Sequence, residues 1–232
     1  PEDQKALLKY AASIRESVMD DADGAIALYQ QVLTTDDSDR EALEALVKLY
    51  VQLERWEQLK DVYQRQSELA EDPDERRQAL YVLGQVYDAE LQDVERAIDT
   101  YQAVLDIDPS DIQAIQALDR LYGQAERWLD QLQILERAVE AVNQAEEQTS
   151  YRFRIGGLWE NQLADTVRSI EAYRDVLHYD PGHQPTIEAL DRIVRGDVEP
   201  MAAAEVLGPF YEQLAEWERL IDVYEVMVTH IE

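Results

Sequence analysis

The chain has 232 residues, a formal net charge of −29, 46% hydrophobic residues and no cysteine. Such a charge repels phosphate groups, so neither nucleic acid nor an anionic membrane is expected as a partner, and the missing cysteines exclude disulfides and thiolate chemistry. The abundance of Ala, Leu, Glu, Gln and Arg favours helices, while no apolar run approaches the ~20 residues that cross a bilayer.

A pattern of apolar residues returns every 72 residues. The segment Ala25-Ile26-x-x-Tyr29-x-x-Val32-Leu33 recurs at residues 97–105 and, with serine in place of its first alanine, at residues 169–177. Within each copy the apolar residues follow helical spacing, and they form four successive stripes. The chain is therefore predicted to contain three units, at residues 1–72, 73–144 and 145–232, each built from four helices.

The predicted helices begin at recognisable capping residues. Ser38-x-x-Glu41 and Ser110-x-x-Gln113 match the capping box, in which two side chains satisfy the first free backbone N–H groups. Asp72-Pro73 places a proline where a helix can start without losing a hydrogen bond. Asp93 can cap the helix that follows it. The short connections between these helices predict antiparallel hairpins.

The third unit departs from the period. Trp56 and Trp128 lie one period apart, but the matching Trp217 comes 17 residues late. Gly196 suits a helix end and Pro200 a helix start, so an inserted helix is predicted near residues 200–214, with a kink or break at Gly208-Pro209. About thirteen helices result. The three tryptophans are expected to be largely buried at equivalent hairpin joints.

These residues resemble the tetratricopeptide repeat family, and long acidic bacterial members of it in particular. The matching positions are Leu80, Leu83-Gly84, Tyr87, Ala97, Tyr101, Val104 and Pro109. The resemblance implies an all-α fold: one α-solenoid of antiparallel helical hairpins over residues 1–232, wound into a right-handed superhelix. Because the chain opens abruptly at Pro1, we expect it to be a fragment of a longer chain. The helix near residues 216–230 is apolar nearly all round, so it is expected to pack on further repeats or on another chain.

The family's geometry also implies a binding site. In this family the first helix of each hairpin lines a concave groove, and transferring its positions one by one gives three rows of residues with both signs of charge. A partner is predicted to contact Lys48, Tyr81, Gln85, Asp88, Gln116, Arg120 and Phe153. A second interpretation stays open, in which these charges only form ion pairs along one helix, such as Glu44–Lys48 and Glu188–Arg192.

No pattern in the sequence points to catalysis, a metal or a cofactor, so none of these is predicted and the chain is not expected to be an enzyme. His178 and His183 flank a turn and are too few for a zinc site. No phosphate-binding glycine loop or nucleophile motif occurs. Gln85 and Gly157 stand where the chaperone-binding members of the family carry asparagine, so a chaperone tail is not the expected partner.

The favoured function is a protein-interaction scaffold that holds a partner peptide or helix in the groove. Two alternatives stay open: an acidic holdase that sequesters basic proteins, and a passive spacer arm within a larger protein. The net charge favours a basic partner, although it also suits a merely solvated surface. With no signal peptide at its start, the chain is expected in the cytoplasm, with the periplasm as the alternative.

Overall fold

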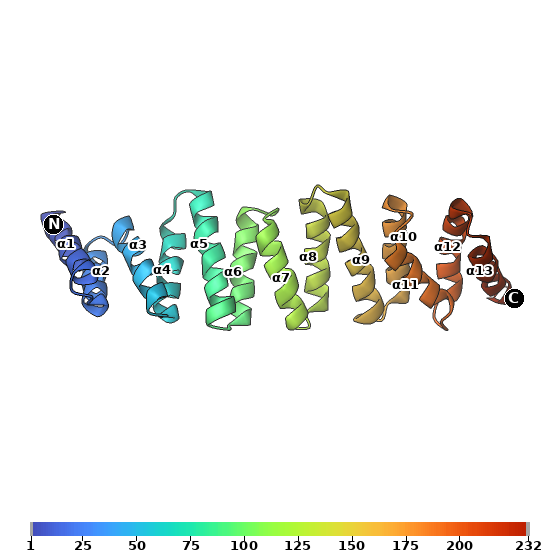
Figure 1. The fold of residues 1–232 in the computed structure, drawn as a ribbon, viewed down its shortest axis with the longest axis horizontal. Coiled ribbons are helices and arrows are strands. Elements are labelled where there is room, and N and C mark those ends of the chain that lie inside the picture. The colour runs from blue at the N-terminus through green and yellow to red at the C-terminus, as the bar shows by residue number, and fades with distance from the viewer. Residues whose placement is uncertain (1, 231–232) are drawn as a thin grey trace. The chain divides into compact units, whose positions relative to one another are not determined.

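The computed structural model describes residues 2–230, which contain thirteen α-helices and no strand. The all-α fold of helical hairpins is therefore confirmed (Figure 1). The chain divides into two compact units, residues 1–109 and 110–232. The first unit contains α1 (Glu2–Ser17), α2 (Ala22–Thr35), α3 (Arg40–Gln52), α4 (Trp56–Leu69), α5 (Pro73–Gln85), a π-helical turn (Val86–Glu90) and α6 (Val94–Ile107). The second contains α7 (Ile112–Gln124), α8 (Trp128–Ala141), α9 (Ala145–Asn161), α10 (Thr166–Tyr179), α11 (Gln184–Val194), α12 (Pro200–Leu214) and α13 (Trp217–His230).

Within each unit a helix packs mainly on the helices before and after it in the chain. In the first unit α1 packs on α2, α4 on α5, and α5 on α6. In the second α8 lies between α7 and α9, and α12 contacts α10, α11 and α13. The apolar stripes predicted from the 72-residue period form the buried surfaces between these neighbours.

Aspartates cap the helices at matching points of the repeat. The carboxylates of Asp21, Asp93 and Asp165 each accept a hydrogen bond from the backbone N–H three residues on, at 2.9 to 3.1 Å. The predicted cap at Asp93 is confirmed. The predicted capping boxes are wrong by one residue, since Asp39 and Asp111, rather than the serines before them, accept the first N–H groups of α3 and α7. An ionised carboxylate is the stronger acceptor at a helix N-terminus.

In each hairpin, the first helix is followed by a residue whose backbone is in the left-handed region. Six non-glycine residues that join a first helix to its second helix have φ between 52° and 57°: Asp20, Glu54, Gln92, Glu126, Ala164 and Ala215. The backbone N–H of the next residue then donates back over the last turn of the helix, for example from Asp165 to the Trp159 carbonyl at 2.8 Å. Each closure therefore carries the steric cost of a side chain in the left-handed region.

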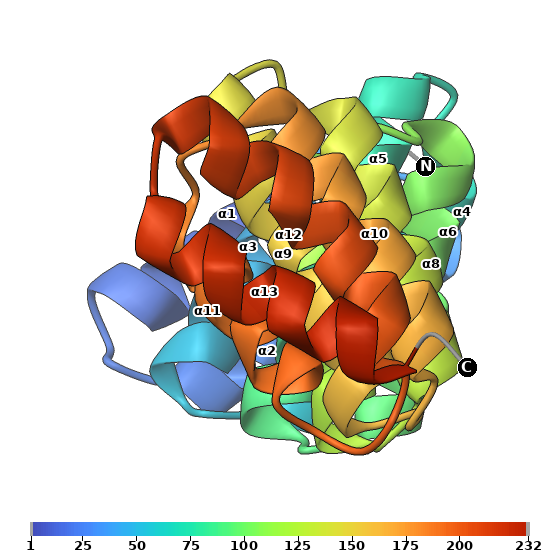
Figure 2. The ribbon, with the colours of Figure 1, turned by 90° about the vertical axis from the view of Figure 1, so that its right-hand side faces the viewer.

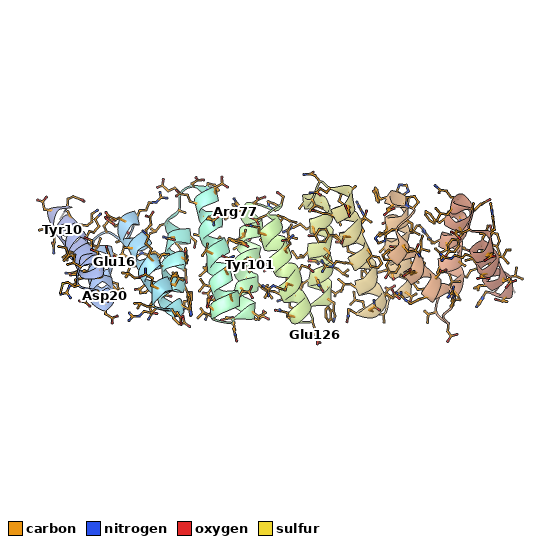
Figure 3. The ribbon with its side chains drawn as sticks, in the orientation of Figure 1. Tyr10, Glu16, Asp20, Arg77, Tyr101 and Glu126 are labelled. Carbon is orange, nitrogen blue, oxygen red and sulfur yellow. The ribbon has the colours of Figure 1, made fainter. Side chains whose placement is uncertain are left out.

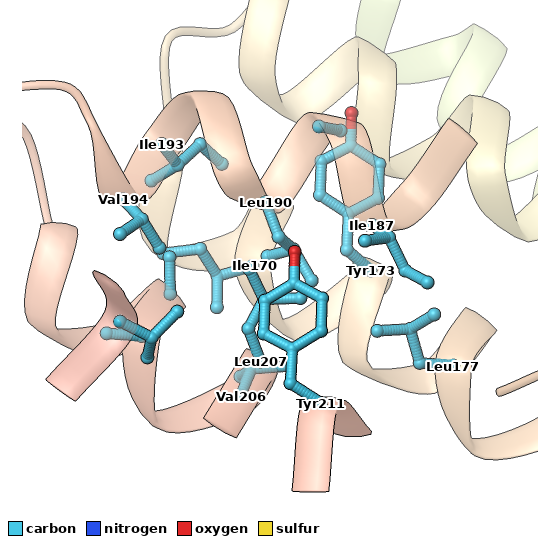
Figure 4. Packing of buried hydrophobic residues seen from close by; sticks show 14 of the residues in the cluster. Ile170, Tyr173, Leu177, Ile187, Leu190, Ile193, Val194, Val206, Leu207 and Tyr211 are labelled. Carbon is cyan, nitrogen blue, oxygen red and sulfur yellow. The ribbon is translucent and has the colours of Figure 1, made fainter. Parts of the chain in front are cut away.

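A close approach between helices explains two glycines of the repeat. A Cβ added at Gly84 would lie 2.8 Å from the Tyr101 ring, and one at Gly156 would lie 2.4 Å from the Tyr173 ring. Both tyrosines are fully buried. Figure 4 shows Tyr173 beside Ile187 in the core of the second unit. Glycine is therefore needed at residues 84 and 156 so that the ring can seat against the first helix.

Two expectations for the third unit need correction. The inserted helix occupies Pro200–Leu214 as predicted, but it continues through Pro209 without a break. Leu207 and Tyr211, on either side of this proline, are completely buried, so packing holds the helix together. Trp56 and Trp128 are largely buried, as expected. Trp217 is 59% exposed, because no helix of the described chain covers that side of α13.

The left-handed backbone of Ala164 predicts how substitutions at this residue change stability. This residue is exposed, so changing it alters the backbone preference without disturbing the core. We expect Ala164→Gly to leave the free energy of unfolding unchanged or raise it by up to about 1 kcal/mol. Ala164→Val should lower it by about 1–2 kcal/mol, because a β-branched residue tolerates this region poorly. Denaturation followed by circular dichroism measures both, and equal stabilities for the two variants would contradict the explanation.

The close contact between Gly156 and the Tyr173 ring predicts that alanine at Gly156 and at the adjacent Gly157 changes stability in opposite directions. Gly156→Ala should lower the free energy of unfolding by about 1–3 kcal/mol, because the new methyl group overlaps the Tyr173 ring. Gly157→Ala is the matched control, since the nearest atom to its added Cβ lies 3.9 Å away. That variant should be more stable than the wild type by up to about 1 kcal/mol, as alanine favours a helix. Urea denaturation compares them, and a stable Gly156→Ala variant would refute the requirement for glycine.

Candidate functional site

The first helices of neighbouring hairpins are joined by ion pairs on one face of each unit, which we name the first-helix face. In the first unit the Lys9 ammonium lies 2.6 Å from Glu41 and joins α1 to α3, while Arg40 lies 3.4 Å from Glu75 and joins α3 to α5. The first helices α1, α3 and α5 therefore follow one another along this face.

A cleft of 820 Å³ opens beside this face, between α3, α4 and α5. Its walls include Arg40 and Glu44 from α3 and Gln78 and Val82 from α5. Lys48 lies one helical turn beyond Glu44 on α3. Tyr81 and Gln85 continue the Gln78 row along α5 in the same way. The predicted residues of the first unit thus extend the two rows that line the cleft.

Lys48 is exposed and forms no ion pair with any residue that the structure describes. The interpretation that pairs it with Glu44 is wrong in this detail, because Glu44 instead accepts from Arg40 at 3.2 Å. Gln85 is also exposed, and Asp88, on the π-helical turn, is half-buried. An unneutralised ammonium in a chain of net charge −29 is available to a partner's carboxylate or carbonyl oxygen.

Tyr81 and Phe153 occupy the same position of the repeat, one in each unit. The Tyr81 ring centroid lies 5.7 Å from that of Tyr101, and the Phe153 centroid lies 5.7 Å from that of Tyr173. Both rings are half-buried. Each ring is therefore packed against another ring while part of its surface stays in solvent, so little rotamer freedom remains to be lost when a partner binds.

In the second unit the predicted residues lie on α7 and α9. Gln116 and Arg120 are exposed on α7, and Phe153 lies on α9, where its ring centroid is 5.2 Å from that of His183 with the ring planes tilted by 60°. A salt bridge between Arg154 of α9 and Asp119 of α7, at 2.8 Å, links these two helices. The seven predicted residues are therefore all exposed or half-buried, and all lie on first helices or on the π-helical turn after α5.

The first-helix face of the second unit continues to α11. Arg192 pairs with Glu160 of α9 at 3.4 Å, and Glu188 instead accepts from Gln184. The predicted pair between Glu188 and Arg192 is thus replaced by a contact between helices. A shallow cleft of 440 Å³ beside α11 is lined by Glu188, Asp191, Arg192 and Arg195. Glu160 also accepts from the buried Tyr173 hydroxyl at 2.6 Å, so one carboxylate ties together α9, α10 and α11.

A buried polar cluster joins α7, α8 and α9, and sequence reasoning missed it. Asp119 accepts from the Gln131 amide at 2.9 Å and from the Arg154 guanidinium at 2.8 Å. Asp119 and Gln131 are both buried. The sequence does contain a sign of this cluster, because Asp119 and Gln131 are polar residues within predicted apolar stripes. The partners are 12 and 35 residues away from Asp119, so the period alone could not pair them.

We next consider metal-binding and titratable groups among the described residues. No three histidine, aspartate or glutamate side chains among residues 2–230 gather closely enough to hold a metal ion. His183 is paired with Thr186 at 2.8 Å, and His178 packs edge-on against Tyr179. Burial and the Glu160 carboxylate raise the pKa of Tyr173, which keeps its hydroxyl protonated. None of the described helices is both long and apolar enough to cross a membrane.

Comparison with known proteins identifies two repeats. Residues 42–77 and 78–111 each match a family model described as tetratricopeptide repeat, which confirms the resemblance seen in the sequence. Among proteins with curated descriptions, none matches this chain.

Several solved structures resemble the chain at low identity. A MamA protein is 18% identical, with 78% of this chain and 93% of that one covered and a TM-score of 0.47. YrrB, described as a TPR protein with an unusual peptide-binding site, is 18% identical, with 78% and 89% covered and a TM-score of 0.44. A tetratricopeptide repeat protein from Parabacteroides merdae is 11% identical, with 99% and 94% covered and a TM-score of 0.45.

The lysines at the start of the first-helix face predict a pH-dependent contribution from Asp39. Burial opposes ionisation of this carboxyl group, but the Ala42 N–H and the ammonium groups of Lys9 and Lys5 outweigh it, so its pKa lies below the usual value. Since the folded pKa is depressed, the stabilisation is complete above the usual value of about 3.9 and is lost as pH falls through the folded value. Asp39→Asn keeps a capping side chain but removes the charge.

We therefore expect Asp39→Asn to lower the urea midpoint at pH 7, with the difference from the wild type shrinking below about pH 4. Asp72→Asn is the matched control, because Asp72 also caps a helix but has no ion pair within the described chain. Its midpoint should stay near that of the wild type throughout. A loss for Asp39→Asn that is the same at both pH values would show that the lysines do not contribute.

Proposed function

From the tetratricopeptide repeats at residues 42–111 we propose that the chain is a protein-interaction scaffold whose first-helix face binds an extended segment or a helix of a partner protein. Repeated hairpins of this kind present a long, continuous surface, and a binding segment can follow it from one first helix to the next. The proposal assigns the chain no catalytic step, no cofactor and no metal.

The unpaired Lys48 is the observation that carries the proposal. The ammonium groups of Lys5 and Lys9 and the guanidinium groups of Arg40 and Arg192 on first helices are all occupied by carboxylates within 3.5 Å. Lys48 instead lies exposed on α3, one helical turn beyond Glu44, which lines the cleft. A side chain whose charge is not used within the fold is available for recognition.

Residues on the neighbouring helix α5 supply other kinds of binding group beside the Lys48 ammonium. Gln85 supplies an amide that can donate and accept hydrogen bonds, and Tyr81 supplies an aromatic edge that the Tyr101 ring holds in place. Aromatic and cationic side chains carry much of the binding energy at protein interfaces. We infer that a partner places an aliphatic or aromatic side chain on Tyr81 and an acidic or carbonyl oxygen on Lys48.

The second unit offers a similar combination on α7 and α9. Gln116, Arg120 and Phe153 again join an amide, a cation and a half-buried ring. The repetition of one chemical set in both units supports binding by segments with a repeated or extended pattern. We propose this set as the contact surface of the second unit.

The net charge of −29 favours a second candidate function, that of an acidic holdase for basic proteins. In that case attraction would come from the whole surface and not from the residues of the first-helix face. The two functions differ in their response to salt, because screening at high ionic strength removes long-range attraction but leaves close packing in place. The net charge also fits the scaffold, since it would steer a basic segment toward the surface on which Lys48 fixes its register.

Charge reversal at Lys48 tests the scaffold. Peptides selected on the wild-type chain from a random display library serve as probes, and isothermal calorimetry measures their affinity in low and high salt. Lys48→Glu should weaken the selected peptides about tenfold or more, which corresponds to about 1.4 kcal/mol. The far-ultraviolet circular dichroism should not change, because Lys48 is exposed and supports no ion pair within the described chain.

Arg65→Glu is the matched control for this experiment. It makes the same change of charge in the same unit, but on the second helix α4, where Arg65 contacts Asp37 at 3.1 Å. The scaffold predicts little change in peptide affinity for this variant. Equal losses in both variants, together with binding that disappears in high salt, would support the holdase instead.

A further inference from the structure

A groove of 860 Å³ opens in the first unit between α2 and α4, the second helices of two neighbouring hairpins. Both helices pack on α3 but make few contacts with each other, whereas the two helices of one hairpin, such as α12 and α13, lie side by side (Figure 2). The floor of the opening is therefore supplied by α3. We name it the second-helix groove and define it by six of its lining residues: Gln30 and Leu33 of α2, Leu46 and Tyr50 of α3, and Asp61 and Val62 of α4.

The second-helix groove is distinct from the first-helix face. Each of the helices α2, α3 and α4 packs on the helix before it and on the helix after it, so the opening lies between complete hairpins. The described residues of α1 that line the groove are Glu2 and Lys5, whereas Tyr10 and Glu16 lie farther along that helix (Figure 3). Among the described residues only Leu43 lines both this groove and the cleft beside the first-helix face. None of the seven residues predicted to contact a partner lines the groove.

The floor of the groove carries a buried hydroxyl group. Tyr50 is only 2% exposed, and its hydroxyl oxygen accepts a hydrogen bond from the Gln30 side-chain amide at 2.9 Å. A tyrosine hydroxyl can also donate one hydrogen, and no residue that the structure describes accepts it. Burial raises the pKa of Tyr50, so the hydroxyl keeps this hydrogen. Because a buried donor without an acceptor costs free energy, a carbonyl oxygen that entered the groove would be stabilised there.

Acidic side chains outnumber basic ones around the groove. Lys5 lies 2.7 Å from Asp36, and Arg65 lies 3.1 Å from Asp37, so the fold already uses both cations. The lining as a whole has four carboxylates against two cations: Glu2, Asp36, Asp37 and Asp61 against Lys5 and Arg65. The groove therefore attracts a cationic ligand and repels an anionic one.

Asp61 on the α4 wall is only partly neutralised within the fold. Its side chain is 71% exposed, and the Lys60 ammonium that lies 3.5 Å from it is closer to Glu57, at 2.8 Å. One ammonium group shared between two carboxylates cannot neutralise both. Asp61 therefore keeps negative charge that the cation of a ligand can use.

The length of the groove suits a short extended segment. Along α4 its lining runs from Gln58 to Arg65. This distance is about 10 Å at the rise of an α-helix, and an extended chain covers it with about three residues. The apolar side chains of Leu33 and Val62 can cover the carbon stem of a long basic side chain while its charged end stays at the rim.

From this combination of shape, charge and buried donor we propose that the second-helix groove binds an extended segment of about three residues with a central arginine or lysine. A backbone carbonyl of the segment accepts from the Tyr50 hydroxyl, and the cation of the segment faces Asp61. The segment belongs to a partner protein, whose basic residues are attracted by a chain of net charge −29. The site lies outside the first-helix face, so it does not depend on the scaffold function proposed above.

A nuclear magnetic resonance titration of the full, isotope-labelled chain tests the proposal. The probe is acetyl-Ala-Arg-Ala-amide, and acetyl-Ala-Gln-Ala-amide is its uncharged counterpart. At low ionic strength the arginine peptide should shift the backbone amide signals of groove residues such as Gln30 and Asp61. It should bind about two- to fivefold more tightly than the glutamine peptide. In about 0.5 M sodium chloride this preference should disappear, because screening removes the attraction to Asp61.

Two substitutions separate the hydroxyl from the charge. Tyr50→Phe removes only the hydroxyl and keeps the buried ring, and it should weaken both peptides about three- to tenfold in low and in high salt. Asp61→Asn should weaken only the arginine peptide, and only in low salt, until it binds like the glutamine peptide. Circular dichroism checks the fold of both variants. If Tyr50→Phe does not fold, Asp61→Asn still decides, because its side chain is exposed.

Tyr63→Phe and Glu44→Gln are the matched controls. They remove the same chemical groups from the same unit, but both residues line the cleft beside the first-helix face and not the groove. Tyr63 is half-buried on α4 and Glu44 is exposed on α3. Both variants should bind the two peptides as the wild type does.

Four results would each overturn the proposal. The arginine peptide at about 10 mM could cause no shift, or it could shift signals around Lys48 instead of the groove. The glutamine peptide could bind as tightly as the arginine peptide in low salt, which would show that Asp61 contributes nothing. A folded Tyr50→Phe variant could bind both peptides like the wild type, which would show that the hydroxyl is not used. None of these results concerns the first-helix face, which Lys48→Glu tests separately.

Discussion

Within each unit, the burial of a helix against its neighbours in the chain is the constraint on which the rest of the structure depends. A single hairpin of this protein is apolar on more than one side, and it can cover those sides only by stacking on the next hairpin. The fully buried Tyr101 and Tyr173 show how tight the stacking is, since each ring reaches the backbone of a first helix where only glycine leaves room. A helix that lacks one neighbour, as α13 does, keeps an apolar face in solvent.

The few basic side chains of this acidic chain form ion pairs at particular places in the fold. The chain carries 50 acidic and only 21 basic residues, so most cations have a carboxylate within reach. On the first-helix face these pairs act between hairpins: Lys9 reaches α3, Arg40 reaches α5 and Arg192 reaches α9. Such pairs are individually weak because they are partly exposed, but they select the alignment of one hairpin on the next. Lys48 takes no part in this pairing.

Salt affects binding on the proposed first-helix face. Binding on the first-helix face is assisted by attraction between an acidic chain and a basic segment, so screening would slow it.

The sequence by itself determined where the helices lie and how they repeat. Tyr29, Tyr101 and Tyr173 mark the 72-residue period, and Gly196 with Pro200 located the inserted helix, because spacing and capping are local properties of a chain. Only the tertiary structure decided which side chains meet across helices, such as Asp119 with Arg154. It also decided that Ala164 adopts a left-handed backbone without being glycine, and that Trp217 is exposed where its counterparts are largely buried. The burial of a side chain depends on which other helix packs against it, and a local sequence pattern does not specify that helix.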